Sequence, residues 1–585
     1  MRPLLVLTLF AIQAGSALVT GEPSPFRWWI VDSLAKVRPL DPFPDSPVKR
    51  AGLSAGRNEF EPFQLVLHAD NVDVADLDVQ VSDLRTPEGL EIPQSNVTVY
   101  LERFLNVTQP SVIGGATGQW PDPLIPRVDQ YAHERRNAFP FVLRQGRNQP
   151  LWVEIFIPES TKPGEYAGSV RISQGAKSIV DIPLSVTVWA FVLPSTSTLK
   201  SSFGLSGIAL LKQHRGRYTN DDDLYSLTRV YARAALQHRI SINGGSMVPP
   251  KYRLEGGRAR IDWSAYDAEV GPLLDGTAIP EGQPLHGAKA TSVELRTPSS
   301  FPTNEQQALY WAESVRHFRQ SGWSDRLFLY LWDEPAAADY PKVLERGRAA
   351  LQANPEIRSL LTTPFTGKLE EVVQIWTPLV NCLERKPGFD DFCAEAPPME
   401  TYLHERALGK SLWFYQSCAS HGCNIPGGLY FAGWPSYMVD ASGTANRVMQ
   451  WLAWKFRIDG ELYYSMNEAY GENMDPWTDV RLFGGNGDGT LFYPGRPDRI
   501  GGLTDIPIES IRLKLIREGM EDYEYLALLA KLEGQSAADK YANRIVQNTY
   551  RWESRPEVFL QVRQELGETL NRLTAAHLRG TTDAQ

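Results

Sequence analysis

The amino-acid sequence predicts a multidomain protein with an N-terminal antiparallel β-sandwich, a central (β/α)8 TIM-type barrel, and C-terminal helices packed on the barrel. Three observations lead to this prediction. The chain has 585 residues, several times the usual domain size. Near residue 195 its pattern changes from short alternating runs to strands separated by long amphipathic segments. From residue 508 onward, apolar residues recur every three or four positions, the period of a helix.

The first residues predict export. Arg2 precedes an apolar run of about a dozen residues, and small residues follow at 15–17, which is the order of charge, core and cleavage site in a secretory signal. A membrane anchor would need about 20 apolar residues, and polar Gln13 and Ser16 interrupt this run. We therefore expect a signal peptide at 1–17, a protein exported to the periplasm or secreted, and no insertion into a membrane.

Residues 24–195 are predicted to form the sandwich. Short alternating runs separated by Pro, Gly, Asn and Asp are typical of antiparallel strands. Examples are "FQLVLHA", "VTVYLERF", "LWVEIFIPE" and "IPLSVTVWAFVLP". A polar linker around 194–201 then separates this region from the next one.

Residues 200–505 are predicted to form the barrel and to carry the catalytic site. Amphipathic segments such as 304–322 fill several of the gaps between strand candidates, as a parallel barrel requires. Residues 506–580 are predicted to be helical. The eight strand candidates of the barrel are 202–206, 240–243, 291–296, 327–332, 358–363, 379–384, 411–416 and 460–467.

Composition argues against several functions. The formal net charge is −10 and no basic stripe occurs, so we expect no nucleic-acid partner. Four clustered cysteines in an exported chain favour disulfides over a metal site. Cys382 with Cys393 and Cys418 with Cys423 is the most local pairing, although the sequence leaves the connectivity open. Zinc would need closer spacing or more histidines than His421. We expect no metal and no organic cofactor.

Asp333 and Glu334 are the candidate catalytic residues. They follow the fourth strand candidate, at the barrel end where active sites are built. Pro335 disfavours a helical backbone at Glu334 and predicts an extended one, in which successive side chains point in opposite directions. The structural alternative is that Asp333 caps a helix with Pro335 in its first turn.

Two such carboxylates suit a substrate-assisted glycosidase. One acid protonates the leaving oxygen. The other orients the 2-acetamido group of the sugar, whose carbonyl oxygen attacks the anomeric carbon in place of an enzyme nucleophile. In an ordinary retaining glycosidase, Glu468 would instead be the nucleophile and would pair with Glu334, since Glu468 follows the last strand candidate.

Side chains near the ends of late strands are the candidate substrate-binding groups, because flat rings stack on sugars and hydroxyls orient them. Tyr415 and Tyr464 are expected to bond the acetamido carbonyl, with Trp434 beside it. The other two candidates are Asn467 and Trp477.

The chain resembles glycoside hydrolase family 123 and its relatives, whose members include β-N-acetylgalactosaminidases. The resemblance covers nearly the whole chain after the signal. The matching stretches are "RNEFEPFQLVL" (57–67), "KPGEYAGSV" (162–170), "YLWDEP" (330–335), "KFRIDGELYYSMN" (455–467), "GDGTLFYPG" (487–495) and "IRLKLIREGMEDYEYLALL" (511–529).

The resemblance implies roles for the two carboxylates. Asp333 matches the residue that orients the acetamido group, and Glu334 matches the general acid/base. The "REGMEDYEYL" stretch marks the family, but its amphipathic pattern favours structural roles for Arg517, Asp522 and Glu524.

The predicted protein is thus an exported glycoside hydrolase. It is expected to release β-linked N-acetylhexosamine, in particular N-acetylgalactosamine, from a glycan, with retention and an oxazoline-like intermediate. The alternatives are a retaining glycosidase acting on another sugar and a non-catalytic carbohydrate-binding protein.

Overall fold

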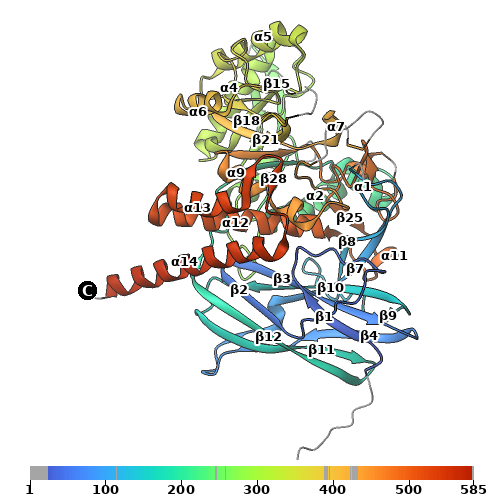
Figure 1. Cartoon of the computed structure of the whole chain (residues 1–585). Helices are drawn as coiled ribbons and strands as arrows, with labels where there is room; N and C mark the ends of the chain where they lie inside the picture. The colour runs from blue at the N-terminus through green and yellow to red at the C-terminus, as the bar shows by residue number, and fades with distance from the viewer. Residues whose placement is uncertain are drawn as a thin grey trace, which may run out of the picture.

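The computed structural model describes residues 24–582, apart from 113–114, 244–246, 257, 388–392, 394–395, 422, 425–432 and 473. The predicted signal peptide therefore lies outside the described residues. Figure 1 shows the barrel strands in the upper part of the molecule and the N-terminal strands in the lower part. Within the described part of the chain, we find no helix that is long and apolar enough to cross a membrane.

Two sheets form the β-rich N-terminal region, and their inner faces bury apolar residues such as Leu65, Val153 and Val186. All strand pairs are antiparallel except β2 with β12. The first sheet has the order β1 (Arg27–Val31), β3 (Glu59–Ala69), β10 (Arg147–Ile157), β7 (Val97–Val107), β8 (Gly118–Pro126), β26 (Ile506–Ser510) and β25 (Phe492–Gly495). The second has the order β2 (Ala51–Arg57), β12 (Lys177–Val192), β11 (Gly164–Gln174), β4 (Val74–Val81) and β9 (Phe141–Leu143), with β5 (Leu84–Arg85) paired to β11 and β6 (Glu91–Ile92) paired to β5.

The first sheet contains two strands from far along the chain. β26 pairs with β8, where Glu509 lies opposite Leu124 and Ser510 opposite Pro123, and β25 pairs with β26. The chain thus returns from the barrel into the N-terminal sheet before the last helices begin.

Eight parallel strands form a nearly closed barrel. Their order is β14 (Ile242–Asn243), β13 (Lys200–Gly204), β22 (Gly460–Tyr463), β21 (Ser411–Tyr415), β20 (Ile375–Trp376), β19 (Ser359–Leu361), β18 (Leu327–Trp332) and β17 (Val293–Glu294). The two end strands of this order, β14 and β17, share no ladder in the described structure, so the ring stays open there. All strand candidates except 379–384 overlap one of these strands.

The sixth strand candidate was wrong. Residues 379–384 contain the 3-10 helix η4 (Val380–Cys382), and the strand is the earlier pair Ile375–Trp376. Pro378 explains the difference, because proline has no N–H to donate to a ladder. The crossover at 362–374 contains turns and no α-helix, so strands and helices alternate only in part.

Helices and short elements fill the other connections. The helices are α1 (Gly207–Arg215), α2 (Asp221–Gln237), α3 (Ser264–Asp275), α4 (Asn304–Gln320), α5 (Tyr340–Ala353), α6 (Met399–Ala407), α7 (Cys418–His421), α8 (Gly443–Arg447), α9 (Met449–Lys455), α10 (Glu468–Gly471) and α11 (Pro497–Ile500). The short elements are the 3-10 helices η1 (Gln94–Asn96), η2 (Ser324–Arg326) and η3 (Ala337–Asp339) and the strand pairs β15 (Lys251–Glu255) with β16 (Arg258–Asp262), β23 (Arg481–Leu482) with β24 (Gly485–Asn486), and β27 (Val546–Asn548) with β28 (Arg551–Trp552).

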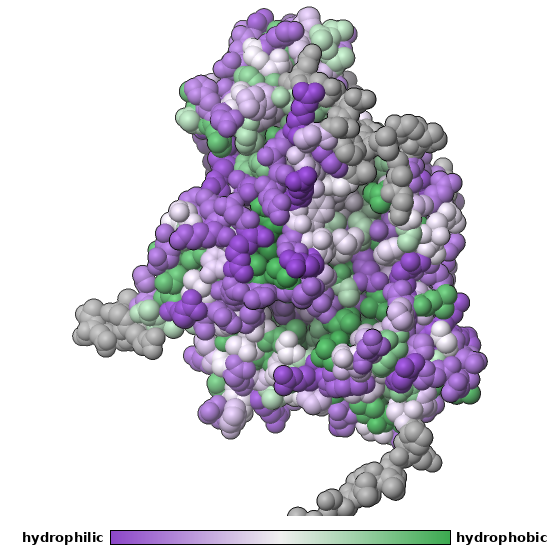
Figure 2. Space-filling view, viewed as in Figure 1, coloured by the Kyte–Doolittle hydropathy of each residue, from purple (hydrophilic) through white to green (hydrophobic). Residues whose placement is uncertain are grey.

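Three long helices end the chain: α12 (Ile511–Glu533), α13 (Gln535–Ile545) and α14 (Pro556–Thr582). The Ser510 hydroxyl caps α12 by accepting a hydrogen bond from the Leu513 N–H over 3.1 Å. Figure 1 shows these helices between the barrel above and the sheets below. On the face shown in Figure 2, hydrophilic residues predominate and hydrophobic ones gather mainly near the middle.

Buried charges on α12 bond to other elements. Arg517 donates to Glu154 of β10, and Asp522 accepts from Arg447 of α8 over 2.7 Å. Glu524 accepts from the backbone N–H of Thr198, in the linker, over 2.6 Å. These contacts agree with structural roles for Arg517, Asp522 and Glu524.

Candidate active site

A cavity of about 690 Å³ opens at the C-terminal end of the barrel strands. Its lining comes from the ends of β13, β14, β17, β18, β19, β21 and β22. Asp333 and Glu334 follow β18, and both are exposed to this cavity. The structure therefore places both catalytic candidates at the barrel end expected for an active site.

Two hydroxyls hold the Asp333 carboxylate. Tyr330 donates to Oδ1 of Asp333 over 2.7 Å, and Thr362 donates to the same oxygen over 2.9 Å. Within the described part of the chain, Oδ2 of Asp333 receives no hydrogen bond. Asp333 does not cap an α-helix, since α5 begins only at Tyr340. The alternative of a helix cap is therefore wrong.

Glu334 is held by groups from two other strands. The Tyr415 hydroxyl donates to Oε1 of Glu334 over 2.5 Å, and the backbone N–H of Glu334 donates to Oγ1 of Thr362 over 2.8 Å. The φ angle of Glu334 is 42°. The extended backbone predicted from Pro335 is therefore wrong, because contacts with Thr362 and Tyr415 override the local preference. Left-handed backbone at a residue other than glycine is strained, and such strain concentrates at functional sites.

The two tyrosines act as hydrogen-bond donors at neutral pH. Burial raises the pKa of the Tyr330 hydroxyl well above its usual value, and the nearby Asp333 carboxylate raises it further. Burial likewise raises the pKa of Tyr415, with Glu334 adding to the effect. Each carboxylate thus has a protonated tyrosine beside it.

Tyr464 also lines the cavity, and Asp488 fixes its hydroxyl. The Tyr464 hydroxyl donates to Oδ2 of Asp488 over 3.0 Å. Burial raises the pKa of Asp488 to about 6, while hydrogen bonds from Tyr464 and from the backbone of Cys418 and Ala419 lower it. Position 489, next to Asp488, requires glycine, because its φ is +65° and a Cβ there would lie 2.4 Å from the Tyr464 hydroxyl oxygen.

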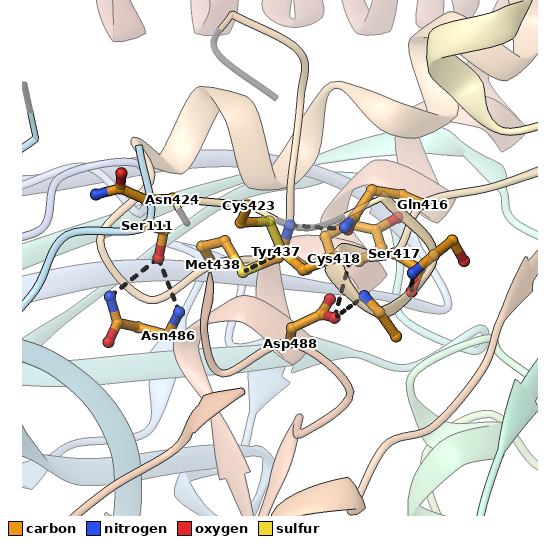
Figure 3. Close-up of a disulfide and its surroundings, with 12 residues drawn as sticks. Ser111, Gln416, Ser417, Cys418, Cys423, Asn424, Tyr437, Met438, Asn486 and Asp488 are labelled. Atoms are coloured by element: carbon orange, nitrogen blue, oxygen red, sulfur yellow. Dashed lines mark hydrogen bonds between the residues drawn. A yellow bond between two sulfur atoms is a disulfide. The ribbon is translucent and has the colours of Figure 1, made fainter. Parts of the chain in front are cut away.

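Asp488 also supports the loop after β21. Its Oδ2 accepts from the N–H of Cys418 over 2.9 Å (Figure 3). Cys418 is bonded to Cys423, and Ala419 and Ser420 of the same loop line the cavity. The structure also joins Cys382 to Cys393. The most local pairing of the four cysteines is thus the one observed.

Three substrate-binding candidates lie outside the lining of this cavity. Asn467 is fully buried and exchanges hydrogen bonds with the backbone of Ser206, which links the ends of β22 and β13. Trp434 is buried with its ring near Tyr550. Trp477 lines a different hollow. A residue that follows a barrel strand in the sequence therefore does not necessarily point its side chain into the cavity.

Other residues at the cavity were missed. Tyr330 and Thr362 hold Asp333, and Glu294 and Arg296 line the wall after β17, where they form a salt bridge of 3.2 Å. Thr362 is one of two polar residues at the end of the strand candidate 358–363, a signal that could have identified it. Glu468, the alternative nucleophile, does line the cavity. The described residues contain no cluster of three His, Cys, Asp or Glu side chains that could hold a metal ion.

These groups can break a glycosidic bond. A carboxyl group that protonates the leaving oxygen and a second carboxylate beside it are the usual apparatus of that reaction. An open cavity at the end of a parallel barrel accommodates a sugar. Fold and site together define a glycoside hydrolase.

Comparison with known proteins gives the family. Residues 40–174 match the glycoside hydrolase 123 N-terminal domain, and residues 288–529 match the glycoside hydrolase 123 catalytic domain. The chain belongs to glycoside hydrolase family 123. No curated protein sequence matches it.

A solved structure shares this fold. A family 123 glycoside hydrolase from Clostridium perfringens, studied for glycolipid glycan hydrolysis, is 14% identical and superposes with a TM-score of 0.67, over 96% of this chain and 100% of the other. A family 5 xyloglucanase from Bacteroides ovatus is 8% identical, over 80% of this chain and 98% of the other, with a TM-score of only 0.28. The superposition on the Clostridium perfringens enzyme establishes the fold.

Proposed function

We propose that this glycoside hydrolase releases β-linked N-acetylgalactosamine from glycans by a retaining, substrate-assisted mechanism. Glu334 is the general acid that protonates the leaving oxygen. Asp333 orients the 2-acetamido group, whose carbonyl oxygen attacks the anomeric carbon and closes an oxazoline-like ring. Glu334 then removes a proton from the water that opens this ring. Neither a metal nor an organic cofactor takes part.

The observation that carries this proposal is how Asp333 is held. Tyr330 and Thr362 both donate to Oδ1, which fixes the carboxylate and leaves Oδ2 free to accept from the N–H of an acetamido group. Polarised through that N–H, the acetamido carbonyl becomes the better nucleophile. Rigid support of this kind is what positioning of a reacting group requires.

The acid has a separate support. Tyr415 donates to Oε1 of Glu334, so the carboxylate that forms after proton transfer stays solvated inside the cavity. The same hydrogen bond keeps Glu334 oriented for the second step, in which it acts as a base. The two neighbouring carboxylates therefore have different partners and can take different roles.

Two further parts of the proposal concern the natural substrate and the location of the enzyme. The Clostridium perfringens relative was studied for glycolipid glycan hydrolysis, and we propose that the substrate here is likewise a glycan that ends in N-acetylgalactosamine. We also propose export, from the signal pattern at residues 1–17. N-terminal sequencing of protein recovered from the periplasm or medium tests this, and a mature chain that still begins at Met1 contradicts it.

A second candidate function uses Glu468. This residue lines the same cavity as Glu334, which supports a role as the enzyme nucleophile in the cleavage of a different sugar. The sugar would then require no acetamido group.

A panel of 4-nitrophenyl glycosides separates the candidates. The proposal predicts cleavage of β-N-acetylgalactosaminide, slower cleavage of β-N-acetylglucosaminide, and a first product with the β configuration by NMR. Comparable rates on 2-hydroxy β-galactoside would instead favour Glu468 as nucleophile. Binding of N-acetylgalactosamine with no hydrolysis of any glycoside would favour a carbohydrate-binding protein.

A further inference from the structure

A second cavity, of about 510 Å³, opens in the sandwich. Its volume falls within the roughly 300–1,000 Å³ of typical small-molecule sites. Residues of β7, β8, β9 and the start of β10 line it, together with Trp477 and Arg499 from the segments on either side of β25. It shares no lining residue with the cavity at the barrel mouth.

All charged side chains in the described lining of this sandwich cavity are arginines. Its described lining contains no Asp or Glu, although the whole chain has a formal net charge of −10. The local excess of positive charge therefore contrasts with the rest of the protein and favours an anionic ligand. The arginines of the lining are Arg103, Arg144, Arg147 and Arg499.

Two of these arginines have no carboxylate partner in the part of the chain that the structure describes. Arg144 pairs with Asp73 and Arg499 with Asp475. In contrast, among the described residues the Arg147 guanidinium donates only to the neutral side chain of Gln119, over 2.8 Å. Arg103 is exposed and makes no ion pair with the described residues.

A β-bulge directs Arg103 into the cavity. The register of β7 and β8 shifts between Glu102 and Phe104. As a result Arg103 and Phe104, although consecutive, both line the cavity. Bulges commonly re-aim side chains in this way at functional sites.

Aromatic and amide groups complete the lining. Phe104 and Trp477 contribute aromatic rings to the lining, and Gln149 and Asn137 contribute amide oxygens, since their amide N–H groups donate to backbone carbonyls. The Trp477 indole N–H donates to the carbonyl of Pro494 over 3.1 Å, which fixes the ring. Ring faces stack on sugars, amides bond hydroxyls, and guanidinium groups bind carboxylate or sulfate with two parallel hydrogen bonds.

We propose that the sandwich cavity is an accessory binding site for an anionic saccharide unit, either a uronate or a sulfated hexosamine. Arg103 and Arg147 bind the carboxylate or sulfate group, while Phe104 and Trp477 pack against the sugar ring. The site would hold an acidic glycan on the same chain as the catalytic barrel. It does not depend on which glycosidic bond the barrel cleaves.

Calorimetric titration of the full-length mature protein tests the proposal. The probes are three tetrasaccharides: one sulfated without uronate, one with uronate but no sulfate, and one neutral. At least one acidic probe should bind and the neutral probe should not, and the acidic probe that binds identifies the group recognised. Arg103→Gln with Arg147→Gln should weaken that binding by about 10-fold or more, because charge-assisted hydrogen bonds are the strong ones.

A matched double variant controls for net charge. Arg171→Gln with Arg253→Gln also removes two positive charges, from exposed positions outside the cavity, and should bind like the wild type. Equal losses in both double variants overturn the proposal, as does binding of all three probes alike or of none. Binding to anionic phosphatidylserine vesicles but to no tetrasaccharide also overturns it. Hydrolysis of an aryl glycoside should be unchanged in both double variants, which separates this test from that of the catalytic mechanism.

Discussion

The hydroxyl oxygen of Thr362 accepts a hydrogen bond from the backbone N–H of Glu334 over 2.8 Å. The same hydroxyl donates to Asp333 over 2.9 Å. One side chain on the neighbouring strand end thus supports both adjacent carboxylate residues. It also helps to hold the left-handed backbone of Glu334, a strain of roughly 1–3 kcal/mol for a residue other than glycine.

Thr362→Val should lower kcat/KM about 10- to 100-fold, because it removes the hydrogen bonds to both carboxylate residues while keeping the side-chain shape. Thr362→Ser is the matched control, since it keeps the hydroxyl, and should stay within about threefold of the wild type. Steady-state kinetics on an aryl N-acetylgalactosaminide measure both. Equal losses in the two variants would show that the methyl group matters and the hydroxyl does not.

Tyr415→Phe should lower kcat/KM about 10-fold or more, since a hydrogen bond to a charged group contributes roughly 1.5–3 kcal/mol. The Glu334 carboxylate that forms after proton transfer would lose its donor. Tyr402→Phe removes a buried barrel hydroxyl that accepts from the Phe365 N–H outside the cavity, and should leave kcat/KM unchanged. A Tyr415→Phe enzyme with wild-type kinetics would contradict the assigned contact.

The position of the catalytic candidates could be predicted from the sequence, and their conformation could not. The apolar run 327–332 indicated a barrel strand, and the strand spans the same residues. Polar residues that end such a strand reach the mouth of the barrel, which placed Asp333 and Glu334. The backbone conformation of Glu334 depends on a hydrogen bond to Thr362, which follows another strand. The extended conformation that Pro335 favours locally was therefore the wrong prediction.

Long-range contacts explain the other differences between the predicted and the observed structure. Strand β26 pairs with β8, a partner more than half the chain away in sequence, and no local pattern encodes such a partner. Asn467 and Trp434 were chosen because they follow strands, but side chains beyond a strand end no longer alternate in a predictable direction. Tyr330 could have been noticed as a polar-tipped residue between buried Leu329 and Leu331.

The two carboxylates should respond differently to the leaving group. Glu334→Gln should slow hydrolysis of a poor leaving group by roughly 10² to 10⁴, the usual contribution of proton transfer. It should slow a dinitrophenyl glycoside far less, because that oxygen leaves without a proton. Asp333→Asn should slow both substrates, since both must form the same cyclic intermediate. The same leaving-group dependence in both variants would rule out separate roles.

Asp488 should make stability depend on pH. Its pKa is about 6 in the folded protein and near 4 when unfolded. Between these values the folded state holds the extra proton, so the free energy of unfolding falls as pH rises, by about 3 kcal/mol at most. The Asp488→Asn side chain keeps an oxygen that accepts hydrogen bonds but does not titrate in this pH range.

Urea unfolding at pH 4, 5, 6 and 7 measures the effect of Asp488. The wild type should lose stability relative to Asp488→Asn between pH 4 and 7, with most of the loss below pH 6, and the difference should level off near pH 7. A difference that does not change with pH across this range would mean that Asp488 is not the titrating group.

The most direct test of the mechanism changes the proposed nucleophile, which belongs to the substrate. Aryl β-N-acetylgalactosaminides in which the acetyl group carries zero, one, two or three fluorine atoms have progressively less nucleophilic carbonyl oxygens, and kcat/KM is measured for each. If the acetamido carbonyl attacks the anomeric carbon while Asp333 orients it, log kcat/KM should fall steeply and steadily with each fluorine. A series with equal rates would contradict the account, because the nucleophile would then be an enzyme group such as Glu468.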